Sequence, residues 1–185
     1  MGANTMTTTT SMGFLWSPSG PWIYLGHGEP DRREWIPSYF YTTPQLDDVC
    51  VRQLRGWKMR SYEGLMNEFS AALQFFDDFG ENWSALKDCL VSLDEWLPAS
   101  AYVIVIERAE ELLIEDPIEL EAFLRTITAA GESWSIAVSS PEQYKRPPIP
   151  FHVLLNVSDG HHEGIARVAR TVDAARTPIP VRTDY

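Results

Sequence analysis

Four acidic side chains gather in the stretch FFDDFGENWSALKDCL, residues 75–90, and they belong to Asp77, Asp78, Glu81 and Asp88. Carboxylates this close in sequence can serve in general acid–base catalysis, bind a hard cation or present a charged face to a partner protein. Their spacing lacks the alternating ligand pattern of a calcium loop. A hydrolase that uses the first three acids stays open as one alternative, with no motif to support it.

The remainder of the sequence carries no catalytic motif. It contains no GxSxG nucleophile elbow and no Walker or dinucleotide-binding glycine pattern. Cys50 and Cys89 make neither a CxxC metal pair nor a disulfide framework, and we expect Cys89 to be a buried free thiol. The adjacent His161 and His162 point in different directions on a helix and cannot share a metal. We therefore expect no enzymatic activity, no cofactor and no metal site.

The charge of the chain is concentrated in one part of it. The 26 acids and 15 bases give a net charge of −11, and the window 75–121 alone, with 13 acids and the two bases Lys87 and Arg108, also carries −11. Such a field repels nucleic acid and anionic membranes and attracts a basic partner protein. For the acids from Glu110 to Glu121 we expect no more than a solvated surface.

Three features of the sequence indicate the cellular compartment of the protein. No stretch approaches the roughly 18 apolar residues of a transmembrane helix. The first residues lack the basic region followed by an apolar core that marks a secretory signal. Together with the absence of a disulfide framework, these features predict a reduced, cytoplasmic protein, which we expect to be a monomer when free.

Three strands must position the acidic stretch. Residues 101–106, AYVIVI, and 151–157, FHVLLNV, are continuous apolar runs, which is typical of strands that are covered on both faces in a parallel sheet. Residues 48–54, DVCVRQL, place apolar residues where a further strand would place them. Helical segments separate these strands, so the strands are expected to be parallel with right-handed crossovers.

Helices are predicted where apolar residues recur at steps of three and four. Ser61 caps the first, whose apolar positions are Leu65, Phe69, Ala72, Leu73 and Phe76. Asn82 caps the second, with core positions at Ala85, Leu86, Cys89, Leu90 and Leu93. Asp116 caps the third, Pro117 is its first residue, and its core stripe is Ile118, Phe123, Leu124 and Ile127. Asp159 can cap a last helix over 163–175.

The element order predicts an α/β fold with a small three-stranded parallel sheet packed with helices. We expect residues 1–47 to form an N-terminal extension that is partly disordered, with possible short strands around Trp22 to Leu25. Residues 48–158 form the α/β domain itself. Residues 159–185 add a C-terminal helix and tail.

The second predicted helix has a face that the core does not use. Its outer positions, at steps of three and four, are Ser84, Lys87, Asp88 and Val91. Asp88 lies in mid-helix, where aspartate is a poor helix former. The spacing supports two interpretations of Asp88 equally. It is either a surface aspartate that the helix tolerates, or a carboxylate that the helix holds rigidly for a partner.

Three stretches of the sequence resemble the barstar family of ribonuclease inhibitors. FGENWSALKDCL, residues 79–90, resembles the central motif of that family. LRGWKMRSYEGLMNEFSAAL, 54–73, resembles its first strand, glycine turn and first helix, and WLPASAYVIVIERAEELL, 96–113, resembles its following loop and middle strand. The resemblance covers roughly residues 50–157, and the family fold is a three-stranded parallel sheet with helices.

The resemblance implies an inhibitor of a small basic ribonuclease or a related toxin. Family members lay the second helix and its preceding loop across the nuclease active site, and one helical aspartate, here Asp88, enters the phosphate pocket. By this likeness, the residues expected to bind the partner are Asp78, Phe79, Gly80, Asn82, Trp83, Ser84, Lys87, Asp88, Leu93 and Asp94.

Three of these positions depart from the family pattern. Asp78 stands where the family has the first of two tyrosines in the binding loop, while Phe79 keeps the second as an aromatic residue. Ser84 stands where the family often has a second aspartate, and Lys87 stands where the founding inhibitor has a large aromatic residue. A positive charge at residue 87 works against a cationic target. The alternative function is therefore an interaction module that keeps the barstar-like scaffold but does not inhibit a ribonuclease.

Overall fold

A parallel β-sheet forms the centre of the computed structural model, which describes residues 15–27, 48–139, 145–158, 162–174 and 181–182. Four strands have five or more residues each, and a fifth has two. Their order across the sheet is β2 (Val49–Arg55), β3 (Ala101–Glu107), β4 (Phe151–Val157), β1 (Ile23–His27) and β5 (Val181–Arg182). All four pairings are parallel, as predicted for the strands at 49–54, 101–106 and 151–157.

The expectation of a three-stranded sheet is wrong, because the N-terminal region contributes β1. This strand pairs with β4 in the register Ile23 to Val153, and its residues alternate between the two faces of the sheet. Ile23 and Leu25 are buried in the main core, while Tyr24 joins a smaller apolar cluster on the other face. Without β1, the apolar strand β4 would present an unpaired edge.

The middle strands are buried on both faces, as their composition predicts. Every residue of β3 and β4 is buried. On β3, Tyr102, Ile104 and Ile106 point into the main core, whereas Val103 and Val105 point to the opposite face. Burial on both faces therefore stabilises β3 and β4 at the centre of the sheet. The helices pack against these two rigid strands.

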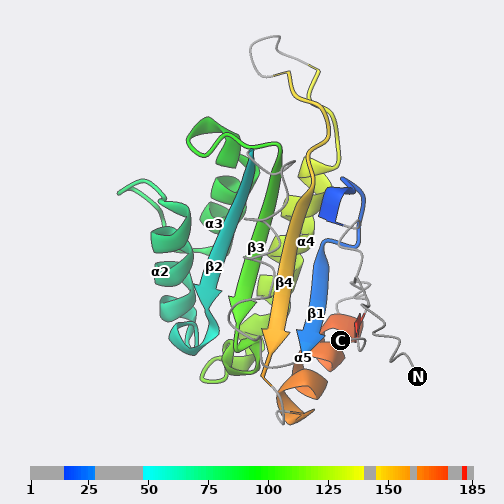
Figure 1. The fold of residues 1–185 in the computed structure, drawn as a ribbon. Helices are drawn as coiled ribbons and strands as arrows, with labels where there is room; N and C mark the ends of the chain where they lie inside the picture. Colours follow the sequence, from blue (N-terminus) through cyan, green and yellow to red (C-terminus); the bar gives the residue numbers. More distant parts are fainter. Residues whose placement is uncertain (1–14, 28–47, 140–144, 159–161, 175–180, 183–185) are drawn as a thin grey trace, which may run out of the picture.

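Three helices cover one face of the sheet, α2 (Tyr62–Leu73), α3 (Trp83–Val91) and α4 (Leu120–Trp134). In Figure 1, α4 lies behind the strands and α2 lies to the left of the edge strand β2. A fourth helix, α5 (His162–Ala174), packs against α4, β1 and a short 3-10 turn, η4 (Ala109–Glu111). The predicted cap Asp159 lies outside the described residues. No helix in the described part of the chain is long and apolar enough to cross a membrane.

Helix α2 begins where Ser61 predicts. The Ser61 hydroxyl accepts a hydrogen bond from the backbone N–H of Gly64 at 3.2 Å. The helix ends at Leu73, because Gln74 takes a left-handed conformation with φ 57°. Phe76 was predicted on the core stripe of this helix, and that is wrong. The chain has left the helix by then, and the Phe76 side chain is 55% exposed.

The start of α4 also differs from the prediction. A 3-10 turn, η5 (Pro117–Glu119), precedes α4, and the Asp116 side chain makes no capping bond there. Its carboxylate instead accepts a hydrogen bond from the backbone N–H of Tyr62 at 2.7 Å, so it caps α2. Ile118 lies in the 3-10 turn, which has three residues per turn, and it is 85% exposed rather than in the core. The rest of the predicted stripe, Phe123, Leu124 and Ile127, is buried.

Candidate protein-binding site

The turn before α3 is held by its own hydrogen bonds. The Asn82 side chain accepts from the backbone N–H of Ala85 at 3.0 Å, which confirms it as the helix cap, and donates to the carbonyl of Gly80 at 2.9 Å. Glu81 takes a positive φ of 46°, and the Tyr62 hydroxyl donates to its carbonyl at 3.0 Å. These bonds fix the direction in which α3 starts.

Trp83, the first residue of α3, ties the helix to two other elements. Its indole N–H donates to the Glu119 carboxylate at 2.9 Å. Its ring lies edge-on to Tyr62 with centroids 5.2 Å apart, and it also contacts Phe123. Trp83 is half-buried, so one part of the indole anchors the helix and another part remains at the surface.

The inner face of α3 packs against the core and α4. Leu86 and Leu90 are fully buried, and the Trp134 indole N–H donates to the Leu90 carbonyl at 2.8 Å. Leu93, in the short turn η3 (Leu93–Glu95), is also fully buried. Its assignment to the partner surface is therefore wrong, because no part of its side chain is accessible; its helical spacing had already placed it in the core.

The outer face of α3 presents Ser84, Lys87 and Asp88 to solvent, with Val91 half-buried beside them. The Asp88 side chain is 68% exposed and Lys87 46%. Among the described residues the Asp88 carboxylate meets one partner, the Lys87 ammonium group at 3.7 Å. Asp88 is thus a surface carboxylate in mid-helix, as its position in the apolar repeat predicts.

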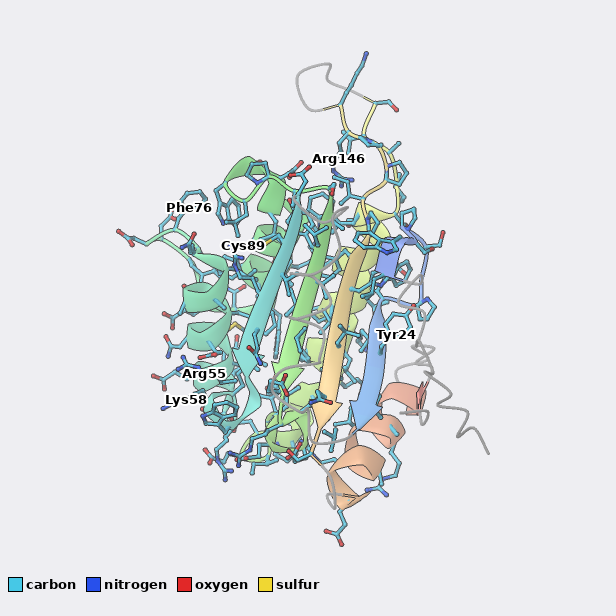
Figure 2. The ribbon with its side chains drawn as sticks, viewed as in Figure 1. Tyr24, Arg55, Lys58, Phe76, Cys89 and Arg146 are labelled. Atoms are coloured by element: carbon cyan, nitrogen blue, oxygen red, sulfur yellow. The ribbon has the colours of Figure 1, made fainter. Side chains whose placement is uncertain are left out.

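The loop between α2 and α3 adds acids and aromatic rings to this face. Asp77, Asp78 and Gly80 are exposed, and Phe79 is half-buried against Phe75 with ring centroids 4.9 Å apart. Phe76 stacks edge-on against Trp96 at 5.0 Å and projects outward from the loop in Figure 2. The helical repeat does not predict Phe76 as a surface residue, because its spacing continues past the residue at which α2 ends.

Cys89 lies on α3 between its inner and outer faces. It is a free thiol, but half-buried rather than buried as predicted. Burial raises the pKa of the Cys89 thiol, and the negative charges of Asp88 and Asp78 raise it further. The thiol is therefore protonated at neutral pH, which is unfavourable for nucleophilic chemistry.

Several acidic residues between 75 and 121 accept hydrogen bonds within the protein. The expectation that the acids from Glu110 to Glu121 form only a solvated surface is therefore wrong. Glu111 and Glu115 each accept a 2.8 Å hydrogen bond from Arg60. Glu110 is buried and accepts from the backbone N–H of Ser158 at 3.2 Å. Just outside that run, Glu107 accepts from the side-chain amides of Gln53 and Asn156. The carboxylates left for a partner are mainly those in and around α3.

Within the described ranges, no group of three or more His, Cys, Asp and Glu side chains is placed to hold a metal ion. Asp77, Asp78 and Glu81 are all exposed on the loop. A capped surface helix with an exposed carboxylate at its centre is suited to contact with another macromolecule.

Comparison with known families gives a match for this part of the chain. The family model described as "Barstar (barnase inhibitor)" matches residues 49–156, more than half of the sequence. The match runs from β2 to β4 and contains α2, α3 and α4, whereas β1 and α5 lie outside it. No curated protein matches the chain.

Proposed function

The chain belongs to the barstar family of barnase inhibitors, and we propose that it blocks the active site of a small basic ribonuclease or a related toxin. It acts as an inhibitor and not as an enzyme. The contact surface is the loop before α3 together with the outer face of that helix. The residues proposed to meet the partner are Asp78, Phe79, Gly80, Asn82, Trp83, Ser84, Lys87, Asp88 and Asp94.

The observation that carries this proposal is the position of Asp88. Its carboxylate is exposed on a helix whose ends are held by the Asn82 cap and by the hydrogen bond from Trp134 to Leu90. An active site that binds RNA phosphates is cationic, and a fixed carboxylate can take the place of a phosphate there. Because the helix is already formed, little conformational entropy is lost on binding.

The surrounding acids support the proposal through their long-range field. Asp77, Asp78, Glu81, Asp94 and Glu95 lie in the loop or at the two ends of α3, and the whole chain carries −11. A field of this sign increases the rate of encounter with a basic protein. Salt screens exposed charges beyond about 8 Å at physiological ionic strength, so association should slow steeply as salt rises.

A second function is favoured by two specific residues. Lys87 places a positive charge beside Asp88, and Ser84 leaves the first turn of α3 without a carboxylate. Both changes reduce complementarity to a cationic pocket. The alternative is that the same face binds another protein and inhibits no ribonuclease.

The test is inhibition of RNA hydrolysis by the full-length protein, with barnase and a panel of other small basic ribonucleases. We expect stoichiometric inhibition of at least one enzyme, in competition with RNA, and weaker inhibition by Asp88→Ala. Binding of an enzyme that still hydrolyses RNA would favour the interaction module. Failure to bind any enzyme of the panel would overturn the proposed function.

A further inference from the structure

Two described stretches between α4 and β4, residues 135–139 and 145–150, form a projecting arm. An antiparallel bridge joins its two sides, with hydrogen bonds of 3.0 and 3.1 Å between the backbones of Val138 and Arg146. In Figure 1 the arm extends beyond the end of the sheet at which the strands begin. This is also the end of the molecule where α3 finishes.

The base of the arm is fixed by Arg146. Its guanidinium group lies over the Trp134 ring, 4.1 Å from the centroid. It donates to the carbonyls of Ser133 at 3.1 Å and Ile136 at 3.3 Å, at the negative C-terminal end of α4. The Arg146 side chain, labelled in Figure 2, is 13% exposed, and its hydrogen bonds join the base of the arm to the end of α4.

A groove of about 440 Å³ separates the arm from the end of α3. One wall comes from α3 and the turn after it, and the other from the arm; the lining residues are Val91, Ser92, Asp94, Glu95, Val138, Lys145 and Arg146. Val91 follows Asp88 by three positions on the same outer face of α3. The groove is therefore continuous with the proposed ribonuclease-binding surface.

The chemistry of the groove is mixed. Val91 and Val138 give it apolar walls. Asp94 lies 4.0 Å from Arg146, the outer limit of an ion pair, and the exposed Glu95 has no ion-pair partner among the described residues. Lys145 is exposed at the rim. The groove therefore has Asp94 and Glu95 on its α3 side, one valine on each wall and the exposed Lys145 at its rim.

We propose that this groove receives a lysine or arginine side chain of the same ribonuclease partner. The aliphatic stem lies between Val91 and Val138, and the cationic end reaches Glu95 and Asp94. Long basic side chains bury their stems on apolar surface while their charge stays with a carboxylate. The inference rests on the proposed function, and it gives the inhibitor a second contact one helical turn beyond Asp88.

The test compares the Kd of two tryptophan variants. One variant fills the groove, and the other places the same side chain at a neighbouring position outside it. Val138→Trp places a large ring in the groove, whereas Ala137→Trp adds the same ring at the neighbouring exposed position. The probe is the ribonuclease of the panel with the lowest Kd. We expect Val138→Trp to raise Kd about tenfold or more, as for a central contact, and Ala137→Trp to change it less than about twofold.

A charge variant tests the cationic end separately. Glu95→Gln should raise Kd and flatten its salt dependence, whereas Glu132→Gln, an exposed change on α4, should do neither. Thermal melting of each variant shows that it is folded. If Asp88→Ala weakens binding but Val138→Trp and Glu95→Gln do not, the groove inference is overturned and the proposed function stands. If Asp88→Ala has no effect, or no ribonuclease binds, the proposed function itself is overturned.

Discussion

The ammonium nitrogen of Lys87 lies 3.7 Å from a carboxylate oxygen of Asp88, although the two residues are neighbours in α3. Adjacent residues on a helix point about 100° apart, so this contact is long and both side chains remain exposed. An exposed pair of this kind contributes little to the stability of the fold. Its importance is for binding, because Lys87 cancels part of the negative potential at the carboxylate proposed to enter the partner.

Replacing Lys87 by alanine should tighten binding to a basic ribonuclease. An exposed charge interaction is worth about 0.2–1 kcal/mol, which corresponds to a decrease in Kd of about 1.5- to 5-fold. The control is Lys58→Ala, because Lys58 lies at the opposite end of the sheet (Figure 2). Isothermal titration calorimetry at low salt measures the Kd of both variants. Weaker binding by Lys87→Ala would show that the ammonium group itself contacts the partner.

Asp88→Ala should separate stability from binding. Aspartate is a poorer helix former than alanine by up to about 0.7 kcal/mol, so the free energy of unfolding should stay the same or rise slightly. Binding should weaken by about 2–5 kcal/mol, the cost of leaving a buried cation unpaired and a range to which barnase–barstar itself contributes. Urea unfolding and titration calorimetry give the two values. A large loss of stability would mean that Asp88 serves the fold.

Ser84→Asp should strengthen both the helix and the complex. Ser84 is exposed in the first turn of α3, where the structure has no acidic residue. A carboxylate near a helix N-terminus stabilises it by about 0.3–1 kcal/mol. The added charge also faces the same side as Asp88 and should lower Kd for a cationic pocket. Ser84→Asn is the control of similar size, and an equal effect of both changes would rule out the charge as the cause.

The stability of the fold should depend on the protonation of His152. Burial lowers the pKa of His152, although the Ser17 carbonyl, 2.9 Å from Nε2, and the backbone of Pro21 oppose this. An unfolded histidine titrates near pH 6.5. Below about pH 6.5 the folded state therefore binds fewer protons at this site than the unfolded state does. The contribution of His152 to the free energy of unfolding is complete above about pH 6.5 and is lost as the pH falls toward the lowered pKa.

This dependence can be measured by urea unfolding of wild type and His152→Gln at pH 7.5 and 5.5. Wild type should lose more free energy of unfolding between these two pH values than the variant, which lacks the titrating ring. Other groups contribute equally to both proteins and cancel in the comparison. The same loss in both proteins would mean that His152 is not the group responsible.

The strands and caps of the family region could be predicted from the sequence because their determinants are local. The apolar runs at 101–106 and 151–157 identify buried strands, and Ser61 and Asn82 each cap the helix they precede. The exposed position of Asp88 follows from the helical repeat. The errors at Phe76 and Ile118 have a common cause, since in both cases the repeat was continued across a residue where the α-helix is not formed.

Other features depend on contacts between distant residues. β1 is five residues long and pairs with β4, about 130 residues further along the chain, so no local pattern distinguishes it from a surface hairpin. The role of Asp116 depends on Tyr62, 54 residues earlier. At Leu93 the helical repeat was correct and the likeness to the family was misleading. The groove beside the arm is likewise a product of tertiary packing.

Gly131→Ala tests how firmly the N-terminal segment is built into the fold. A Cβ atom at residue 131 of α4 would lie 2.2 Å from Cγ of Trp22, the residue that leads into β1. Alanine is the better helix former by about 1 kcal/mol, so propensity alone predicts stabilisation. Overpacking costs about 1–3 kcal/mol, and a contact this short with the half-buried Trp22 ring places the change at the upper end. We expect a net loss of about 1–2 kcal/mol in the free energy of unfolding.

A second substitution identifies the cause of that loss. Trp22→Ala removes the ring that the new methyl group would contact. Gly131→Ala should therefore lower the free energy of unfolding less in the Trp22→Ala protein than in wild type. Without the clash, the higher helix propensity of alanine should offset part or all of the loss. Ser133→Ala, an exposed change two residues along α4, is the control and should be nearly neutral. Additive effects of the two changes would show that Trp22 does not pack on Gly131 in solution. Because β1 lies outside the family match, this pair tests a contact that the family relationship does not imply.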